Sequence, residues 1–243
     1  MGDGKSALKV AILTTETLHH AHFVRAVAEV YPQTRVYEEK RPISARFETA
    51  HPFEDDRAEH ERNTWFDGKE RTLDEFAPVE TYTDINDPVC IQHLTEFEPD
   101  AIIVFGTGKI GEDLINIRPD RIVNLHGANP EHYVGIDTHL WAIYHRDFEG
   151  LVTTLHRVES IMDRGGVVLS ADIPIRPGMK MYELRQANTE VCIHLTLSAL
   201  DLLEKFDQFI SRPQTMKGRR YSFMPAVLKD DCQRYFETYT ASL

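Results

Sequence analysis

The chain has 243 residues, 42% of them hydrophobic and 27% charged, a balance typical of one large globular domain. It has no run of the roughly 18 apolar residues that a membrane span requires and no apolar leader, so we expect a cytoplasmic protein without membrane contact. The 39 acidic residues outnumber the 27 basic ones, and the net charge of −12 disfavours a nucleic-acid partner. Three widely spaced cysteines without a Cys-x-x-Cys pair predict neither a disulfide framework nor a zinc site.

Short apolar runs alternate with helical patterns along the chain. Strands are expected at residues 8–13, 34–37, 101–105, 121–126, 151–158 and 167–175, and helices at residues 22–30, 112–116 and 181 to about 210. This alternation predicts an α/β protein with a mostly parallel central sheet and helices on both faces. Such sheets bind ligands at the carboxyl ends of their strands.

Residues 41–80 interrupt the alternation with charge-rich sequence and isolated aromatic residues. Two interpretations stay open: a solvated helical excursion, or an insertion that contributes to a substrate site, as long excursions from compact α/β domains often do. We expect residues 1–212 to form the main domain, with residues 213–243 as a short tail packed on it.

Three glycines follow the apolar run at residues 101–105. Gly106, Gly108 and Gly111 fit the pattern G-x-G-x-x-G, which in a suitable context binds a dinucleotide. Here the motif lies far from the first strand. The next strand, at residues 121–126, also lacks the terminal acidic residue that would bind a ribose. The context therefore disfavours NAD.

Polar side chains end the strand at residues 121–126. Asn124 and His126 are two residues apart, so their side chains project from one face, where His126 either satisfies loop carbonyls or takes part in chemistry. Asp163 precedes a Gly-Gly turn and could meet His126 at the same sheet edge, where a carboxylate would stabilise the protonated ring. Together the three supply an oxyanion donor, a proton carrier and a charge partner, which suits acyl transfer between nitrogen atoms.

These residues resemble the folate-dependent formyltransferase family over roughly residues 100–175. The family motif is Asn-x-His-Gly at a strand end, then a loop with Pro, a Gly before a helix, and an Asp-x-Gly turn. The corresponding residues are 124–127, Pro130, Gly135, 137–139 and 163–165. The resemblance implies a Rossmann-like formyltransferase fold and 10-formyltetrahydrofolate as the formyl donor, with no metal.

The resemblance also implies roles for individual residues. Asn124 would hold the formyl oxygen, His126 would stabilise the tetrahedral oxyanion, and Asp163 would pair with His126 and relay protons. The pterin would lie against backbone, with the folate-binding residues being Phe105, Gly106, Thr107, Gly108, Lys109, Ile110, Val158, Ile161 and Met162.

The acceptor is suggested by three further segments, at residues 51–66, 129–147 and 218–229. They are most similar to bacterial sugar N-formyltransferases, which formylate nucleotide-linked 4-amino-4,6-dideoxy sugars for surface polysaccharides such as lipopolysaccharide O-antigen. The resemblance implies a GDP-perosamine-like acceptor and a homodimer. The implied acceptor-binding residues are His20, Glu131, Tyr133, Asp137, His139 and Trp141, although Trp141 also fits a core position.

Other functions stay open at this stage. They are a formyltransferase for glycinamide ribonucleotide or another small amine, a formyltetrahydrofolate hydrolase, and a non-catalytic protein that binds a nucleotide sugar or folate. The tRNA enzyme of this family has the sequence Ser-Leu-Leu-Pro after its His-Gly. That sequence is absent after Gly127, which disfavours tRNA as the acceptor. Adjacent histidines at residues 19–22 lack the spacing of a metal site, and Arg219-Arg220 is either a solvated pair or a diphosphate contact.

Overall fold

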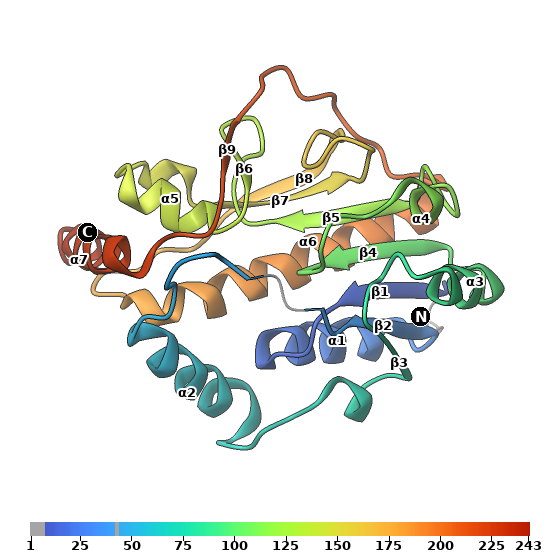
Figure 1. Ribbon diagram of the computed structural model, residues 1–243, viewed down its shortest axis with the longest axis horizontal. Helices are drawn as coiled ribbons and strands as arrows, with labels where there is room; N and C mark the ends of the chain where they lie inside the picture. The colour runs from blue at the N-terminus through green and yellow to red at the C-terminus, as the bar shows by residue number, and fades with distance from the viewer. Residues whose placement is uncertain (1–7, 42–43) are drawn as a thin grey trace.

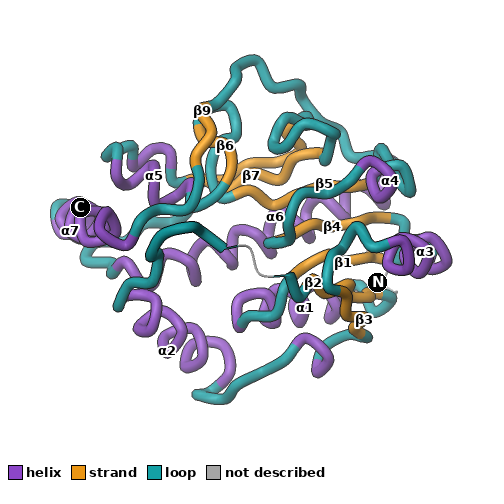
Figure 2. Tube along the Cα trace, in the orientation of Figure 1, coloured by secondary structure: helices purple, strands orange, loops and turns teal. Residues whose placement is uncertain are grey.

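A computed structural model describes residues 8–41 and 44–243 of the chain (Figures 1 and 2). Seven strands form one sheet in the order β3-β2-β1-β4-β5-β7-β8, and β6 pairs with β9 separately. The strands are β1 Val10–Thr14, β2 Thr34–Glu39, β3 Val79–Tyr82, β4 Ala101–Phe105, β5 Ile122–His126, β6 Tyr133–Gly135, β7 Val152–Arg157, β8 Val167–Asp172 and β9 Arg219–Tyr221. The α-helices are α1 Leu18–Val30, α2 Phe53–Phe66, α3 Pro88–Phe97, α4 Glu112–Ile115, α5 Thr138–Tyr144, α6 Leu184–Phe206 and α7 Ala226–Ala241.

The sheet is parallel from β3 through β5, and β7 and β8 then add two antiparallel pairings at the other edge. This confirms the predicted mostly parallel sheet. In Figure 1 the arrows of β1, β4 and β5 point to the same side of the molecule. Because β1 lies between β2 and β4, the chain changes direction across the sheet at β1. Open α/β sheets form their ligand crevice at such a switch point.

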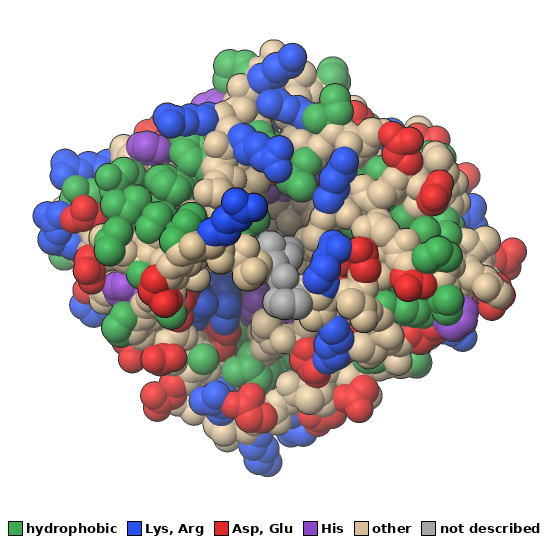
Figure 3. Space-filling model, in the orientation of Figure 1, with side chains coloured by type: hydrophobic (Ala, Val, Ile, Leu, Met, Phe, Trp, Pro, Cys, Tyr) green, Lys and Arg blue, Asp and Glu red, His purple; other side chains and the backbone are tan. Residues whose placement is uncertain are grey.

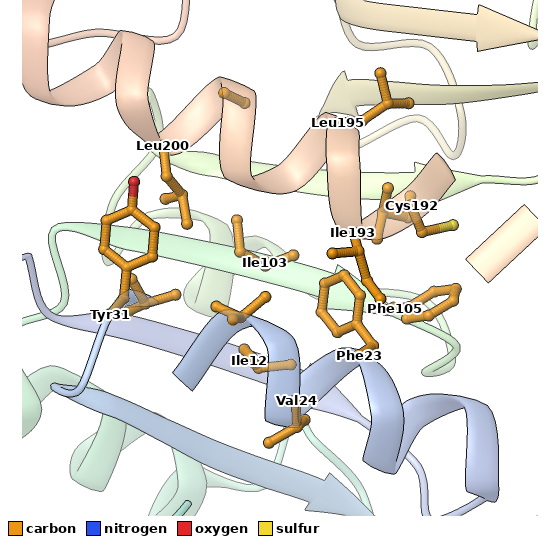
Figure 4. Close-up of a cluster of buried hydrophobic side chains, with 14 of the residues drawn as sticks. Ile12, Phe23, Val24, Tyr31, Ile103, Phe105, Cys192, Ile193, Leu195 and Leu200 are labelled. Carbon is orange, nitrogen blue, oxygen red and sulfur yellow. The ribbon is translucent and has the colours of Figure 1, made fainter. Parts of the chain in front are cut away.

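The strand β1 is buried on both sides because apolar residues occupy both faces. Val10 and Ile12 belong to a core with α1 and α6, part of which is drawn in Figure 4, whereas Ala11 and Leu13 belong to a core with α3 and α4. Helices therefore cover both faces of the sheet, as predicted. Burial of this kind contributes about 25 cal/mol per Å² of apolar area.

Several elements differ from those expected. The helix α1 begins at Leu18 rather than at residue 22, and β8 ends at Asp172 rather than at residue 175. The strands β3, β6 and β9 and the helices α3 and α7 were not predicted from the sequence. A signal for α3 was available, since Asp87 caps it by accepting a 2.8 Å hydrogen bond from the Val89 N–H, and Pro88 stands at its first position.

The charge-rich segment at residues 41–80 contains α2, whose apolar residues are few but buried. Phe53, Trp65 and Phe66 lie in the core, and the Trp65 indole donates a 2.8 Å hydrogen bond to Glu190 on α6. The excursion is therefore helical and held against the main body. Within the described residues, we find no helix with the length and apolar character needed to cross a membrane.

The tail adds β9 and α7, and α7 packs against α5 on the left of Figure 1. Met224, Cys232 and Phe236 from the tail share a core with Ala142 and Ile143 from α5. The tail is therefore part of a buried cluster rather than a loose appendage.

Truncating this cluster tests how much the tail stabilises the fold. Phe236 is fully buried, so Phe236→Ala should lower the free energy of unfolding by about 3–5 kcal/mol through lost burial and the cavity left behind. Val227 on the same helix is 78% exposed, and Val227→Ala should change stability by no more than about 0.5 kcal/mol. Urea unfolding measures both, and equal stability of the two variants would contradict the packing.

Candidate active site

A cavity of about 1380 Å³ lies at the carboxyl ends of β1, β4 and β5. Its wall also includes residues of α2, α5 and the start of α6. Figure 3 shows Lys and Arg side chains around a hollow on this face. Sites for one small molecule commonly measure about 300–1,000 Å³, so this cavity has room for two.

Asn124 and His126 project from the end of β5 and line the cavity. His126 is buried, and its Nε2 lies 2.8 Å from the carbonyl oxygen of Tyr133. A carbonyl only accepts hydrogen bonds, so Nε2 carries the proton of the neutral ring and Nδ1 bears the lone pair. The backbone of Tyr133 thus selects the tautomer of His126.

Asp163 reaches the same place from the loop between β7 and β8. Its Oδ2 lies 3.9 Å from Nδ1 of His126 and accepts a 2.9 Å hydrogen bond from the backbone N–H of Gly135. The turn brings Gly165 so close to β7 that a Cβ there would lie 1.8 Å from the carbonyl oxygen of Arg157. The Asp-x-Gly sequence is therefore what allows the loop to approach and places the carboxylate beside the imidazole.

His156 is a fourth member of the cluster, and the sequence analysis missed it. It lies opposite Asn124 in the antiparallel pairing of β5 with β7, and its Nδ1 donates a 2.8 Å hydrogen bond to the Arg157 carbonyl. Its Nε2 is 3.1 Å from the amide nitrogen of Asn124 and 3.6 Å from Oδ1 of Asp163. In the neutral ring Nε2 accepts from that amide. This uses one of the two N–H groups of Asn124 and leaves the other for a ligand.

Burial lowers the pKa of His126, and the nearby charge of Asp163 opposes this by raising it. Burial of Asp163 acts to raise the pKa of its carboxyl. Its contacts with His156, His126 and the Gly135 N–H outweigh that effect, and the pKa lies below its usual range. At neutral pH the pair is thus a neutral imidazole next to a carboxylate, poised for His126 to take up a proton when negative charge develops nearby.

The glycine-rich loop after β4 is held by protein groups. Gly106 has a φ of 86°, and a Cβ there would lie 2.7 Å from Nε2 of His20, so the position requires glycine. The N–H of Gly108 donates a 2.6 Å hydrogen bond to the carboxylate of Glu39. A carboxylate facing the loop repels phosphate, which accords with the expectation against NAD.

This loop forms one wall of the cavity, together with the segment that follows β7. Gly106 and Gly108 carry no side chains, and the neighbouring wall is largely apolar. Such a surface suits a flat heteroaromatic ring, so the residues present fit a pterin. The apolar residues of this wall are Val104, Phe105, Ile110, Val158 and Met162.

Most of the residues expected at the site line the cavity. They are Asn124, His126, Asp163, residues 105–110, Val158, Met162, Asp137 and His139. Two others do not. Ile161 is 69% exposed, and His20 is buried beneath Gly106, where burial lowers the pKa of its ring to about 3.

Three residues expected to bind the acceptor also lie outside the cavity wall, because the fold uses them elsewhere. Glu131 accepts hydrogen bonds from the backbone and hydroxyl groups of Thr215, which holds the tail. Tyr133 contributes its backbone carbonyl to His126. The indole of Trp141 donates to the carbonyl of Ser222 and lies beside aromatic rings.

Arginine side chains in the cavity wall were not anticipated, apart from Arg220. Arg57 comes from α2 and Arg185 from α6. Neither follows a strand, so the rule that polar residues at strand ends form the site does not find them. Among the described residues, no group of three or more His, Cys, Asp or Glu side chains is arranged to hold a metal ion.

Comparison with known families places this geometry in context. Residues 10–199 match the family described as Formyl transferase, and the match extends over most of the chain. The chain therefore belongs to the formyl transferase family.

Curated proteins that resemble the chain include methionyl-tRNA formyltransferases. One from Rhodopirellula baltica is 30% identical over 141 residues, which cover 55% of this chain and 40% of that protein. The matches to five such relatives span between 36% and 48% of the length of those proteins, so the chain covers less than half of each.

Solved structures show the same fold at low sequence identity. Rv3404c of Mycobacterium tuberculosis, suggested to be a sugar N-formyltransferase, aligns with a TM-score of 0.61 and 13% identity over 88% of this chain and 75% of that one. WlaRD, a sugar 3N-formyltransferase solved in the presence of dTDP and 5-N-formyl-THF, aligns with a TM-score of 0.59 and 13% identity over 98% and 80%. These likenesses confirm the Rossmann-like formyltransferase fold.

The electrostatic coupling of Asp163 to His126 is directly testable. Asp163→Asn removes the charge that raises the pKa of His126, so that pKa should fall further below its usual range. The ring would then be neutral at a lower pH than in the unmodified protein. Nitrogen chemical shifts of the His126 ring, followed by NMR across a pH titration, measure this change. The exposed Asp172, changed in the same way, should leave the titration unaltered, and a rise on Asp163→Asn would contradict the coupling.

Proposed function

We propose that the chain is a folate-dependent N-formyltransferase, which moves a formyl group from 10-formyltetrahydrofolate to an amine. The observation that carries the proposal is the cluster of Asn124, His126 and Asp163 at one wall of a cavity of about 1380 Å³. The cluster supplies hydrogen-bond donors and a charge pair but no nucleophile. It therefore suits direct transfer between two bound molecules.

The proposed reaction follows from the hydrogen bonds of the cluster. The amine nitrogen attacks the formyl carbon and the carbonyl oxygen takes the negative charge. Asn124 donates its second amide N–H to that oxygen while His156 orients the amide. The amine nitrogen gives up one proton, which Asp163 passes to Nδ1 of His126, while Nε2 stays bound to the Tyr133 carbonyl. The protonated ring then donates to the oxyanion and Asp163 balances its positive charge. The same proton passes on to N10 as the bond from the formyl carbon to N10 breaks, and His126 returns to its neutral form.

In this proposal the two substrates occupy different ends of the cavity. Folate occupies the wall of residues 105–110 and 158–163. The acceptor occupies the side formed by α2, α5 and the first turn of α6. Asp137 and His139 lie on this second side, and the His139 ring is fixed by a 2.7 Å contact between Nε2 and the Val152 carbonyl oxygen.

The proposed acceptor is a nucleotide-linked 4-amino-4,6-dideoxy sugar, such as GDP-perosamine. The likeness of the fold to WlaRD supports a nucleotide-linked amino sugar as the acceptor, because that sugar 3N-formyltransferase was solved in the presence of dTDP and 5-N-formyl-THF. The curated relatives point to a second acceptor, methionyl-tRNA. The net charge of −12 favours the small acceptor, since it repels a polyanion.

Removing any of the three cluster side chains should slow formyl transfer. Asn124→Ala, His126→Ala and Asp163→Ala should each lower kcat by about 10²-fold or more, the usual contribution of an oxyanion donor or an acid–base group. His194 is an exposed histidine on α6, and His194→Ala serves as the control with unchanged kcat. Full activity of the His126→Ala protein would refute the mechanism.

The acceptor is identified by offering 10-formyltetrahydrofolate with a panel of amines. The panel contains nucleotide-linked amino sugars, glycinamide ribonucleotide and methionyl-tRNA, and mass spectrometry follows the replacement of an amine hydrogen by a formyl group. Formylation of a 4-amino sugar nucleotide supports the proposal. Formylation of methionyl-tRNA alone would overturn the acceptor class. Formate release without any formylated product would indicate a hydrolase instead.

A further inference from the structure

Two guanidinium groups meet in the acceptor half of the cavity. Arg57 comes from the second turn of α2 and Arg185 from the first turn of α6, and both line the cavity wall. They influence each other electrostatically, since each positive charge disfavours the other. Like charges are brought together in a folded protein at a cost, which a bound anion can offset.

The guanidinium group of Arg57 has hydrogen-bond donors available for a ligand. Its Nε is buried and makes no hydrogen bond within residues 8–41 and 44–243. Its contact with Glu54 is long, at 3.6 Å between Nη2 and Oε1. That carboxylate oxygen is also bound more tightly, at 3.0 Å, by Nζ of the buried Lys229. A buried guanidinium N–H without an acceptor is costly, so an acceptor supplied by a ligand is the natural partner.

Arg185 is held firmly in place. Its Nε and Nη2 donate 2.6 Å hydrogen bonds to the two oxygens of Glu61, which is fully buried on α2. This bidentate pair fixes the plane of the guanidinium and leaves the Nη1 group for another partner. The same pair also ties α2 to α6 and so fixes the helix that carries Arg57.

On this side of the cavity the cations Arg57, Arg185 and Lys229 lie among the carboxylates of Glu54, Glu61 and Asp137. Burial lowers the pKa of Arg57 to about 10, with a further lowering by Arg185, so the group still carries its charge at neutral pH. Burial and the neighbouring His20 and Arg185 hold the pKa of His19 well below its usual range, which leaves that ring neutral. The carboxylate of Asp137 faces the same region but accepts a 2.8 Å hydrogen bond from the Met224 N–H.

From this arrangement we propose that Arg57 and Arg185 form an anion subsite, which binds a phosphate or carboxylate group of the acceptor. The assignment of the anion to the acceptor rests on the proposed function, whereas the subsite itself does not. The subsite assigns a functional role to the segment at residues 41–80, because α2 brings to the cavity a cation that the sheet does not provide. The anionic group would lie on the side of Asp137 and His139, away from the glycine loop.

The test measures binding of simple anions to the full chain by isothermal titration calorimetry at low ionic strength. The probes are inorganic pyrophosphate and succinate. The variants are Arg57→Gln, Arg57→Lys and Arg62→Gln. Arg62 is the matched control, because it lies on the same helix, pairs with Glu70 and does not line the cavity. Arg185 is left unchanged, since its loss would leave Glu61 buried without a partner.

Pyrophosphate should bind the unmodified protein saturably with one site. Arg57→Gln should weaken that binding by about 10-fold or more, as expected for loss of a charge-assisted hydrogen bond, and Arg57→Lys should retain part of it. Arg62→Gln should bind as the unmodified protein does. Tighter binding of pyrophosphate than of succinate would identify a phosphate group as the natural anion, and the reverse order would identify a carboxylate.

The subsite is refuted if neither probe binds the unmodified protein saturably, or if Arg57→Gln binds as tightly as the Arg62→Gln control. Circular dichroism melting of each variant shows whether a loss of binding reflects unfolding. If only Arg57→Gln melts at a lower temperature than the unmodified protein, the binding of Arg57→Lys is the deciding measurement. Failure of Arg57→Lys to bind the anion more tightly than Arg57→Gln would count against the subsite. Because no formyl transfer is measured, failure of the acceptor panel leaves this result standing, and failure here leaves the transfer reaction standing.

Discussion

The site depends on one buried carboxylate. Asp163 is almost fully enclosed, and a buried charge is costly unless neighbouring groups compensate it. The N–H of Gly135 supplies a donor from β6, and the rings of His126 and His156 supply polarisable partners from β5 and β7. Each of these groups comes from a different element, so the position of the carboxylate depends on the placement of β5 and β7 in the main sheet and of β6 outside it.

The change from parallel to antiparallel pairing after β5 brings the polar groups of the cluster together. If β7 ran parallel to β5, the chain between the two strands would need a crossover connection before β7 could begin. Because β7 instead runs back along β5, it places His156 directly opposite Asn124, and its end leads into the loop that carries Asp163. Four polar groups are thus collected within two paired strands and one turn, beside a core that is otherwise apolar.

The sequence pointed to three of the four members of this cluster, Asn124, His126 and Asp163, the last from the Gly-Gly turn that follows it. Asn124 and His126 are visible because a two-residue period places them on one face of an apolar strand. His156 was missed although its strand was expected, because its relevance depends on the antiparallel register with β5, which no local pattern encodes. Arg57 was missed for another reason: α2 has scarcely any apolar periodicity, so neither its orientation nor its buried face could be inferred.

The same limit explains the residues assigned to the acceptor that lie elsewhere. Tyr133 and Trp141 are aromatic residues near the motif, and their position in the sequence predicts that their side chains bind a ligand. The structure instead uses the Tyr133 carbonyl to set the tautomer of His126 and packs Trp141 against the tail, which the sequence analysis had not resolved into elements. A residue's backbone can matter to a site when its side chain does not, and side-chain type gives no sign of this.

The glycine loop is anchored to β2 through Glu39, whereas Arg57 stands on a helix fastened to α6. The two walls of the cavity are therefore supported by separate parts of the chain. In the proposed division of the cavity, the side that holds the formyl donor and the side that holds the acceptor are therefore encoded in different segments of the sequence.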